Sequence, residues 1–281
     1  MMIYGWIYNP FQAVEKIPAS LLNSVHSLDE LSLQLPAGAY TTFITFEKNK
    51  ALAYSLHLSR LEETSKLSGY EVLINREVFN KALSDLVNSV NISNLKIRLI
   101  LDFKNPLKTI YILAEPAQFP PEDYYLKGVD VQISHLERMT PEAKKTDFIQ
   151  ASHKLREILQ GRLNEAVMVN ENGELLEGLS SNFFGVINGV VQTASSGILE
   201  GITRRLVIDE IVKHKIPIRY APIKIQEIGS LDEAFITSTS RFVLPIRKMD
   251  DIVIGEDIPG TITKQVMNFY KLRMQSELET I

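Results

Sequence analysis

Apolar and polar positions along the chain follow two periods, one typical of strands and one typical of helices. Alternation over residues 39–46 (AYTTFITF), 95–103 (LKIRLILDF) and 108–115 (KTIYILAE) predicts strands, and a further strand is expected in 51–56 after a polar Glu-Lys-Asn-Lys turn. Helical spacing over residues 57–70 and 75–92 predicts two helices, the second with Phe79, Leu83, Leu86 and Val87 on one face.

The second half of the chain begins after a stretch with three prolines, EPAQFPPEDYYLKG, which indicates a linker. Strands are expected at 129–138 and 232–240, and helices at 147–163 (ending near Gly161), 201–216 and 259–278. Two hairpins lie between them, with Asn-Gly turns at 172–173 and 188–189. The pattern predicts an α+β protein of two domains, 1–118 and 126–281, joined by a linker at 119–125.

Composition narrows the possible classes of function. The 281 residues are 45% hydrophobic and 23% charged, which is ordinary for a globular protein able to bury a core in each domain. A net charge of −4 without a basic cluster argues against nucleic-acid binding. The absence of cysteine excludes disulfides, thiol catalysis and cysteine metal sites, and fits a reducing cytoplasm. No basic leader and no apolar run of ~20 residues is present, so neither a signal peptide nor a membrane span is expected.

Polar side chains interrupt an apolar run in ELLEGLSSNFFGV (174–186), at Glu177 and at Ser180 to Asn182. A Glu after a hairpin is commonly exposed, whereas a buried one needs a cationic or N–H partner because an unpaired buried charge is very costly. The adjacent lysines Lys144 and Lys145 are open to two interpretations as well. They are either solvated surface residues or include a lysine whose neutral amine forms a Schiff base.

Two hydroxyl-bearing segments are candidates for binding phosphate. Gly201, Ile202 and Thr203 open a helix, whose free N–H groups and positive potential suit an anion, although Thr203 could instead be a simple N-cap. The segment TSTS (237–240) ends a strand and supplies either further phosphate donors or only a polar strand end. No metal site is expected.

Five segments in chain order resemble one family: HLSRL, AKKTDF, EAVMVNENGELLEGLSSNFFGV, ILEGITRRLV and FITSTSRFVLPI. They are similar to the class-IV pyridoxal-phosphate enzymes of fold type IV, which include branched-chain aminotransferases, D-amino-acid transaminases and 4-amino-4-deoxychorismate lyases. The resemblance extends from Gly38 to Ile246 and is strongest from 144 to 246. It implies a small N-terminal α/β domain and a larger C-terminal domain, which binds pyridoxal 5′-phosphate (PLP) and has a β-barrel-like core flanked by helices.

The resemblance also implies roles for individual residues. Lys144 matches the lysine that holds PLP as an internal aldimine, because its distance to Glu165-Ala166 is that of the family, and Lys145 is the alternative. Glu177 matches the carboxylate beneath the pyridine nitrogen, so its partner is expected to be that ring and not a protein cation. The remaining matches are Arg60, Ile202, Thr203, Ser238 and Thr239 for the phosphate, Leu199 against the ring, and Tyr40, Ser181 and Asn182 on the substrate side.

The implied reaction is transamination between an amino acid or amine and a 2-oxo acid, with Lys144 moving the Cα proton. The segment YTTF favours the alternative, a 4-amino-4-deoxychorismate lyase that releases pyruvate and 4-aminobenzoate. A cofactor-binding protein without turnover is less favoured, because both Lys144 and Glu177 are present. A homodimer that acts on small-molecule substrates is expected from the resemblance alone.

Some positions depart from the family pattern. Asp147 stands where the family has asparagine, and Asp102-Phe103 stands where many transaminases have an arginine that grips the substrate carboxylate. That grip is therefore unassigned, with Arg241, Lys104 and Arg247 as candidates.

Overall fold

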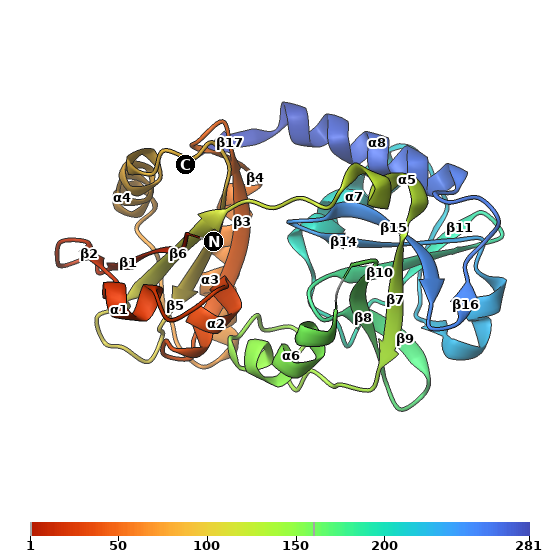
Figure 1. The fold of residues 1–281 in the computed structure, drawn as a ribbon, viewed down its shortest axis with the longest axis horizontal. Helices are drawn as coiled ribbons and strands as arrows, with labels where there is room; N and C mark the ends of the chain where they lie inside the picture. Colours follow the sequence, from red (N-terminus) through yellow and green to blue (C-terminus); the bar gives the residue numbers. More distant parts are fainter. Residues whose placement is uncertain (1, 160) are drawn as a thin grey trace. The chain divides into compact units, whose positions relative to one another are not determined.

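The computed structural model describes residues 2–159 and 161–281, and the chain divides into two units (Figure 1). Unit 1 comprises Met1–Gln118, Ala143–Ala151 and Glu277–Ile281, and unit 2 comprises Phe119–Glu142 and Ser152–Ser276. The segment that carries Lys144 thus belongs with unit 1, although it falls within the sequence range predicted for the second domain. Met1, in the predicted first domain, and Gln160, in the predicted helix 147–163, lie outside the described residues.

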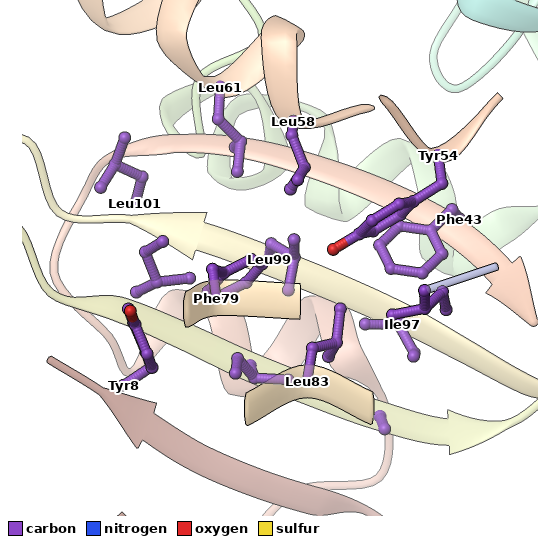
Figure 2. Close-up of a cluster of buried hydrophobic side chains, with 14 of the residues drawn as sticks. Tyr8, Phe43, Tyr54, Leu58, Leu61, Phe79, Leu83, Ile97, Leu99 and Leu101 are labelled. Carbon is purple, nitrogen blue, oxygen red and sulfur yellow. The ribbon is translucent and has the colours of Figure 1, made fainter. Parts of the chain in front are cut away.

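Unit 1 contains an antiparallel sheet of seven strands in the order β17-β4-β3-β5-β6-β1-β2. The strands are β1 (Tyr4–Tyr8), β2 (Glu15–Lys16), β3 (Ala39–Phe46), β4 (Lys50–Leu52), β5 (Leu95–Leu101), β6 (Ile110–Pro116) and β17 (Leu278–Thr280). One apolar cluster includes Phe43, Leu99 and helix residues such as Leu58 and Phe79, as Figure 2 shows. A second cluster includes Tyr40, Ile100 and Leu113. Since β5 contributes alternate residues to both clusters, the sheet is buried on both faces.

Four helices belong to unit 1: α1 (Ala19–Leu22), α2 (Leu28–Leu33), α3 (Tyr54–Leu67) and α4 (Arg76–Ser89). Helix α4 begins where the Asn75 side chain accepts a hydrogen bond from the Val78 N–H. Its buried face consists of Phe79, Leu83 and Val87, as the helical spacing predicts. The strand predicted at 51–56 is wrong beyond Leu52, because Ala53 adopts a left-handed conformation (φ 52°) and α3 starts at the next residue.

Six strands of unit 2 form a closed barrel, since β10 pairs with both β14 and β9. In order around the barrel they are β10 (Asn182–Ile187), β14 (Glu233–Ser238), β15 (Phe242–Met249), β7 (Val129–Ser134), β8 (Leu163–Val169) and β9 (Glu174–Gly178). The shorter strands β11 (Val190–Thr193), β12 (Ile218–Tyr220), β13 (Ile223–Lys224) and β16 (Ile252–Val253) extend it. The predicted α+β class with a barrel-like core is confirmed.

Helices accompany the barrel strands in Figure 1. The helices after residue 118 are α5 (Glu122–Lys127), α7 (Ile202–Lys213), the 3-10 helix η1 (Ile225–Ser230), α8 (Thr261–Ser276) and α6 (Asp147–Ile158), whose residues are divided between the units. Helix α7 packs on β14, and α8 packs on β14 and β15. No helix within residues 2–159 or 161–281 combines the length and apolar character that crossing a membrane requires.

The alternation of side chains along the barrel strands fixes which groups face the core. Phe183 on β10, Ile236 on β14 and Leu244 on β15 are cross-strand neighbours and belong to one buried apolar cluster. Their neighbours in sequence must therefore point to the opposite face. On that outer face Asn182 and Thr237 lie directly opposite each other at the ends of β10 and β14.

Candidate functional site

Lys144 lies in an extended segment beside the start of β3 in unit 1. The Tyr40 N–H donates to the Lys144 carbonyl at 2.8 Å, and the Thr146 N–H donates to the Gly38 carbonyl at 3.0 Å. The Gly38 N–H in turn donates to the Thr146 hydroxyl at 3.0 Å. These three bonds hold the lysine segment in register with Tyr40.

The two adjacent lysines have different surroundings. The Nζ atom of Lys144 lies 4.7 Å from the centroid of the Tyr40 ring. The Nζ atom of Lys145 lies 4.0 Å from a carboxylate oxygen of Asp147, whose side chain is mostly exposed. Successive residues in an extended segment point to opposite sides, so only one lysine can face Tyr40. This geometry favours Lys144 over Lys145 as the reactive lysine, which stays a prediction.

A buried histidine lies close to Lys144 and to Arg60 of α3. His57 shares a hydrogen bond of 2.7 Å with the Thr41 hydroxyl, and the Thr64 hydroxyl one turn from Arg60 accepts from the Lys144 N–H at 3.3 Å. Burial, together with the positive charges of Arg60 and Lys144, lowers the pKa of His57 to about 3. The imidazole is therefore neutral, and the two cations lie near the same buried group.

Arg98 on β5 also contacts the Tyr40 ring, with its Cζ atom 5.3 Å from the ring centroid. Its guanidinium is bound on several sides from within unit 1. It pairs with the Asp29 carboxylate at 2.7 Å and donates to the hydroxyls of Ser32 at 2.9 Å and Thr42 at 3.3 Å. The positive charge of Arg98 is thus compensated by Asp29 on α2.

In unit 2, three polar side chains form a row across the ends of β9, β10 and β14. Glu177 and Asn182 are paired across β9 and β10, and Asn182 is paired with Thr237 across β10 and β14. The Asn182 amide donates to Glu177 at 3.1 Å and to the Leu199 carbonyl at 2.8 Å. The three residues are only 2%, 5% and 1% exposed, respectively. We call Glu177, Asn182 and Thr237 the polar row.

Glu177 has a protein cation as a partner. The Nε atom of Arg138 lies 3.4 Å from its carboxylate, and both side chains are buried. The expectation that its partner is not a protein cation is therefore wrong, because a carboxylate this deeply buried requires compensation of its charge. Sequence reasoning missed Arg138, which stands in an irregular segment after β7 where no spacing relates it to Glu177.

The start of α7 lies against the polar row. Gly201 is the N-cap, and no side chain caps the free N–H groups of the first turn, which begins with Ile202 and Thr203. A Cβ atom on Gly201 would lie 2.1 Å from the Asn182 amide oxygen, so only glycine fits there. The alternative that Thr203 is the N-cap is wrong. An uncapped N-terminus of a long helix suits an anion.

Other predicted site residues surround Glu165, which is fully buried on β8. Its carboxylate accepts from the hydroxyls of Ser181 at 2.8 Å and Ser180 at 3.0 Å, and pairs with Arg241 at 2.7 Å. Burial is the largest single influence and opposes ionisation of Glu165. The charges of Arg241 and Arg156 and the hydrogen bonds from Arg241 and Ser181 together outweigh it and lower the pKa of the carboxyl. Arg241 also donates to the Ser238 hydroxyl at 3.2 Å. The single hydroxyl proton of Ser181 is thus already used within the protein.

Comparisons with known proteins decide the family. The model of the family "Amino-transferase class IV" matches residues 38–249. An enzyme from Thermotoga maritima named "Probable branched-chain-amino-acid aminotransferase" is 30% identical over 87% of this chain and 88% of its own length. The chain belongs to the class IV aminotransferases. A D-alanine aminotransferase from Listeria innocua is 24% identical over 86% of this chain and 89% of its own.

Solved structures of class IV aminotransferases share the fold. The Escherichia coli branched-chain amino acid aminotransferase superimposes with a TM-score of 0.79 at 21% identity, covering 99% of this chain and 98% of its own. The branched-chain amino acid aminotransferase of T.th., solved with pyridoxamine 5′-phosphate, gives a TM-score of 0.79 at 20% identity with the same coverage. The predicted family and the predicted transaminase activity are confirmed, and the lyase alternative is not favoured. The roles of individual residues stay predictions.

Proposed function

We propose that this class IV aminotransferase uses PLP to move an amino group between an amino acid and a 2-oxo acid. The observation that carries this proposal is the polar row beside the uncapped N-terminus of α7. A buried carboxylate fits a protonated ring nitrogen, and free helix N–H groups fit a phosphate. When bound, PLP supplies an electron sink for the carbanion formed at the substrate Cα.

Lys144 would carry the cofactor and move the Cα proton. A lysine acts as a base only as the neutral amine. Tyr40, whose ring contacts the Lys144 amine, would limit where that amine can reach on the substrate side.

The phosphate would be held by Arg60 and by the hydroxyl and N–H groups of the two segments predicted from the sequence. Ser238 can still donate, because its hydroxyl accepts a hydrogen bond from Arg241 and keeps its own proton. The first-turn N–H groups at Ile202 and Thr203 have no side-chain cap that a phosphate would need to displace. Thr239 follows Ser238 directly and would add a further hydroxyl.

Glu177 would keep a proton on the ring nitrogen of PLP. Arg138 lies beside the carboxylate, and the Asn182 amide donates a hydrogen bond that fixes its orientation. Leu199, whose carbonyl binds the same amide, would pack against the ring.

We propose an amino acid with an apolar side chain as the substrate. The cations that could grip a second carboxylate are engaged: Arg98 with Asp29, Arg241 with Glu165, and Arg247 with Asp130 at 2.6 Å. Lys104 is exposed. An acidic side chain would therefore have to displace an internal carboxylate, at a cost that an apolar side chain avoids. Three of the proteins named above are branched-chain aminotransferases by name.

Borohydride reduction tests the cofactor and the lysine together. Protein saturated with PLP should be yellow, and reduction followed by peptide mapping should find the cofactor on residue 144. Lys144→Ala should abolish the label, and the matched control Lys145→Ala should retain it. A label on Lys145, or no label, contradicts the assignment.

An assay of substrates tests the reaction. Amino acids with apolar, acidic and basic side chains are supplied with 2-oxoglutarate or pyruvate, and aminodeoxychorismate is supplied separately. We expect transamination of apolar amino acids. Formation of 4-aminobenzoate without transamination would contradict the proposed function.

A homodimer and a cytoplasmic location complete the proposal. Family resemblance supports the dimer, and the lack of cysteine in the 281 residues fits a reducing compartment. Light scattering of the purified protein tests the first, and cell fractionation tests the second.

A further inference from the structure

Thr237 has a buried hydroxyl without a partner in the described part of the chain. The residue is 1% exposed, and its Oγ1 atom has no hydrogen-bond partner there. A buried polar group left unpaired costs about 1–3 kcal/mol, so such groups call for a specific explanation. The predicted site hydroxyls of Ser181 and Ser238 differ, because the first donates to Glu165 and the second accepts from Arg241.

The position of Thr237 connects this hydroxyl to the candidate site. Thr237 lies directly opposite Asn182, and directly paired residues of neighbouring strands share one face. The Asn182 amide is already committed to Glu177 and Leu199, so it has no proton left for Thr237. Among the described residues, the hydroxyl thus ends the polar row as its one member without an internal hydrogen bond.

We propose that Thr237 is a cofactor-binding residue whose hydroxyl forms a hydrogen bond with bound PLP. The inference rests on the proposed function, and it adds Thr237 to Ser238 and Thr239, the two residues of the segment TSTS for which the family resemblance implies a role. It also explains the unpaired hydroxyl, since an unfavourable group in the empty protein becomes a favourable contact once the ligand is bound.

A second buried threonine provides a control that distinguishes a contact with the cofactor from an ordinary packing defect. Thr263 on α8 is also 1% exposed, and its Oγ1 also lacks a partner among the described residues. Its N–H donates to Glu233 at the start of the helix, so it has a structural role outside the polar row. The variant Thr263→Val is therefore a matched control for Thr237→Val.

The experiment measures PLP dissociation constants of the apo proteins by spectral titration, and melting temperatures with and without PLP. For Thr237→Val we expect about a tenfold rise in the dissociation constant, while the apo melting temperature stays equal or rises. The dissociation constant rises because valine removes a contact from the complex. The apo melting temperature does not fall because valine also removes an unpaired hydroxyl from the empty protein. Thr237→Ser and Thr263→Val should both stay within about twofold of the unmodified protein.

Three outcomes overturn the inference. They are an unchanged dissociation constant in Thr237→Val, an equal rise in Thr263→Val, or a fall in the apo melting temperature of Thr237→Val alongside weaker binding. An unmodified protein that binds no PLP overturns the proposed function together with the inference. Normal binding by the unmodified protein and by Thr237→Val overturns the inference alone.

Discussion

Glu177 lies buried beside the guanidinium of Arg138. Two buried charges that compensate each other add little stability, but removing one leaves the other unpaired in a medium of low polarity. Arg138 therefore matters most when the ring nitrogen of a cofactor is absent. The stability of the apo protein is therefore the property expected to change most when Arg138 is replaced.

We predict that Arg138→Met lowers the free energy of unfolding of the apo protein by about 3–5 kcal/mol, the usual cost of a buried charge that has lost its partner. Urea denaturation measures this. The matched control is Lys127→Met, which breaks an exposed pair with Asp123 and should cost less than about 1 kcal/mol. Equal effects of the two variants would contradict the prediction.

His57 gives the protein a defined dependence on pH. Burial, with Arg60 and Lys144 nearby, lowers its folded pKa to about 3, below the unfolded value of about 6.5. The unfolded state therefore binds the proton first, so the stabilisation is fully present above pH 6.5 and is lost as the pH falls towards 3.

Between pH 7 and pH 5 the unmodified protein should lose about 2 kcal/mol more of its unfolding free energy than His57→Gln. Glutamine stays neutral and can still bond with Thr41. Denaturation curves at the two pH values measure the difference, and parallel losses in both proteins would show that His57 does not titrate in this way.

Among the elements, the start of α7 is sensitive to one added atom because it lies against the polar row. Gly201 has an ordinary helix-start conformation, φ −60° and ψ 140°, so alanine there meets no backbone strain. What it meets is the Asn182 amide oxygen, 2.1 Å from the position of its Cβ.

We predict that Gly201→Ala displaces Asn182, disturbs the orientation of Glu177, and weakens PLP binding by tenfold or more. Spectral titration measures the binding. Gly229→Ala is the matched control, since a Cβ on Gly229 would meet nothing within 4 Å. Similar affinities for the two variants would show that the helix start tolerates the displacement.

Local patterns predicted the elements whose partners are close in sequence. The hairpin at Asn188-Gly189 has positive φ at both turn residues, 51° and 75°, as a two-residue turn of this kind requires. Strand β17 was not predicted, because three residues near the C-terminus pair with Lys50–Leu52 and carry no periodic signal of their own.

The residues of the candidate site also differ in how far along the sequence their partners lie. Glu177 and Asn182 were predicted from one contiguous stretch, since strand pairing brings together residues only five apart. Thr237 reaches Asn182 through the pairing of β14 with β10, and Arg138 reaches Glu177 from the segment after β7. Both come from far along the chain, and no local spacing encodes these contacts. Ser181 and Ser238 were named for their hydroxyls, and no local pattern indicates that Glu165 and Arg241 engage them.

In the whole molecule, each of the two units is built from segments that are not contiguous in the sequence. Unit 1 takes its lysine segment from residues 143–151 and its edge strand β17 from residues after 276. We predict that a fragment of residues 1–118 lacks a cooperative thermal transition, because it loses the backbone bonds to Lys144 and Thr146 and the pairing of β17 with β4. Circular dichroism measures this, and a sharp transition close to that of the full protein would contradict it.

The position of β17 in the sequence affects when unit 1 can be completed during synthesis on the ribosome. N-terminal domains generally fold first as a chain emerges. Here the N-terminal unit is completed only when residues Leu278–Thr280 have left the exit tunnel, after all of unit 2 has been translated. The unit that begins to form first is thus completed only after unit 2 has been translated, by the pairing of β17 with β4.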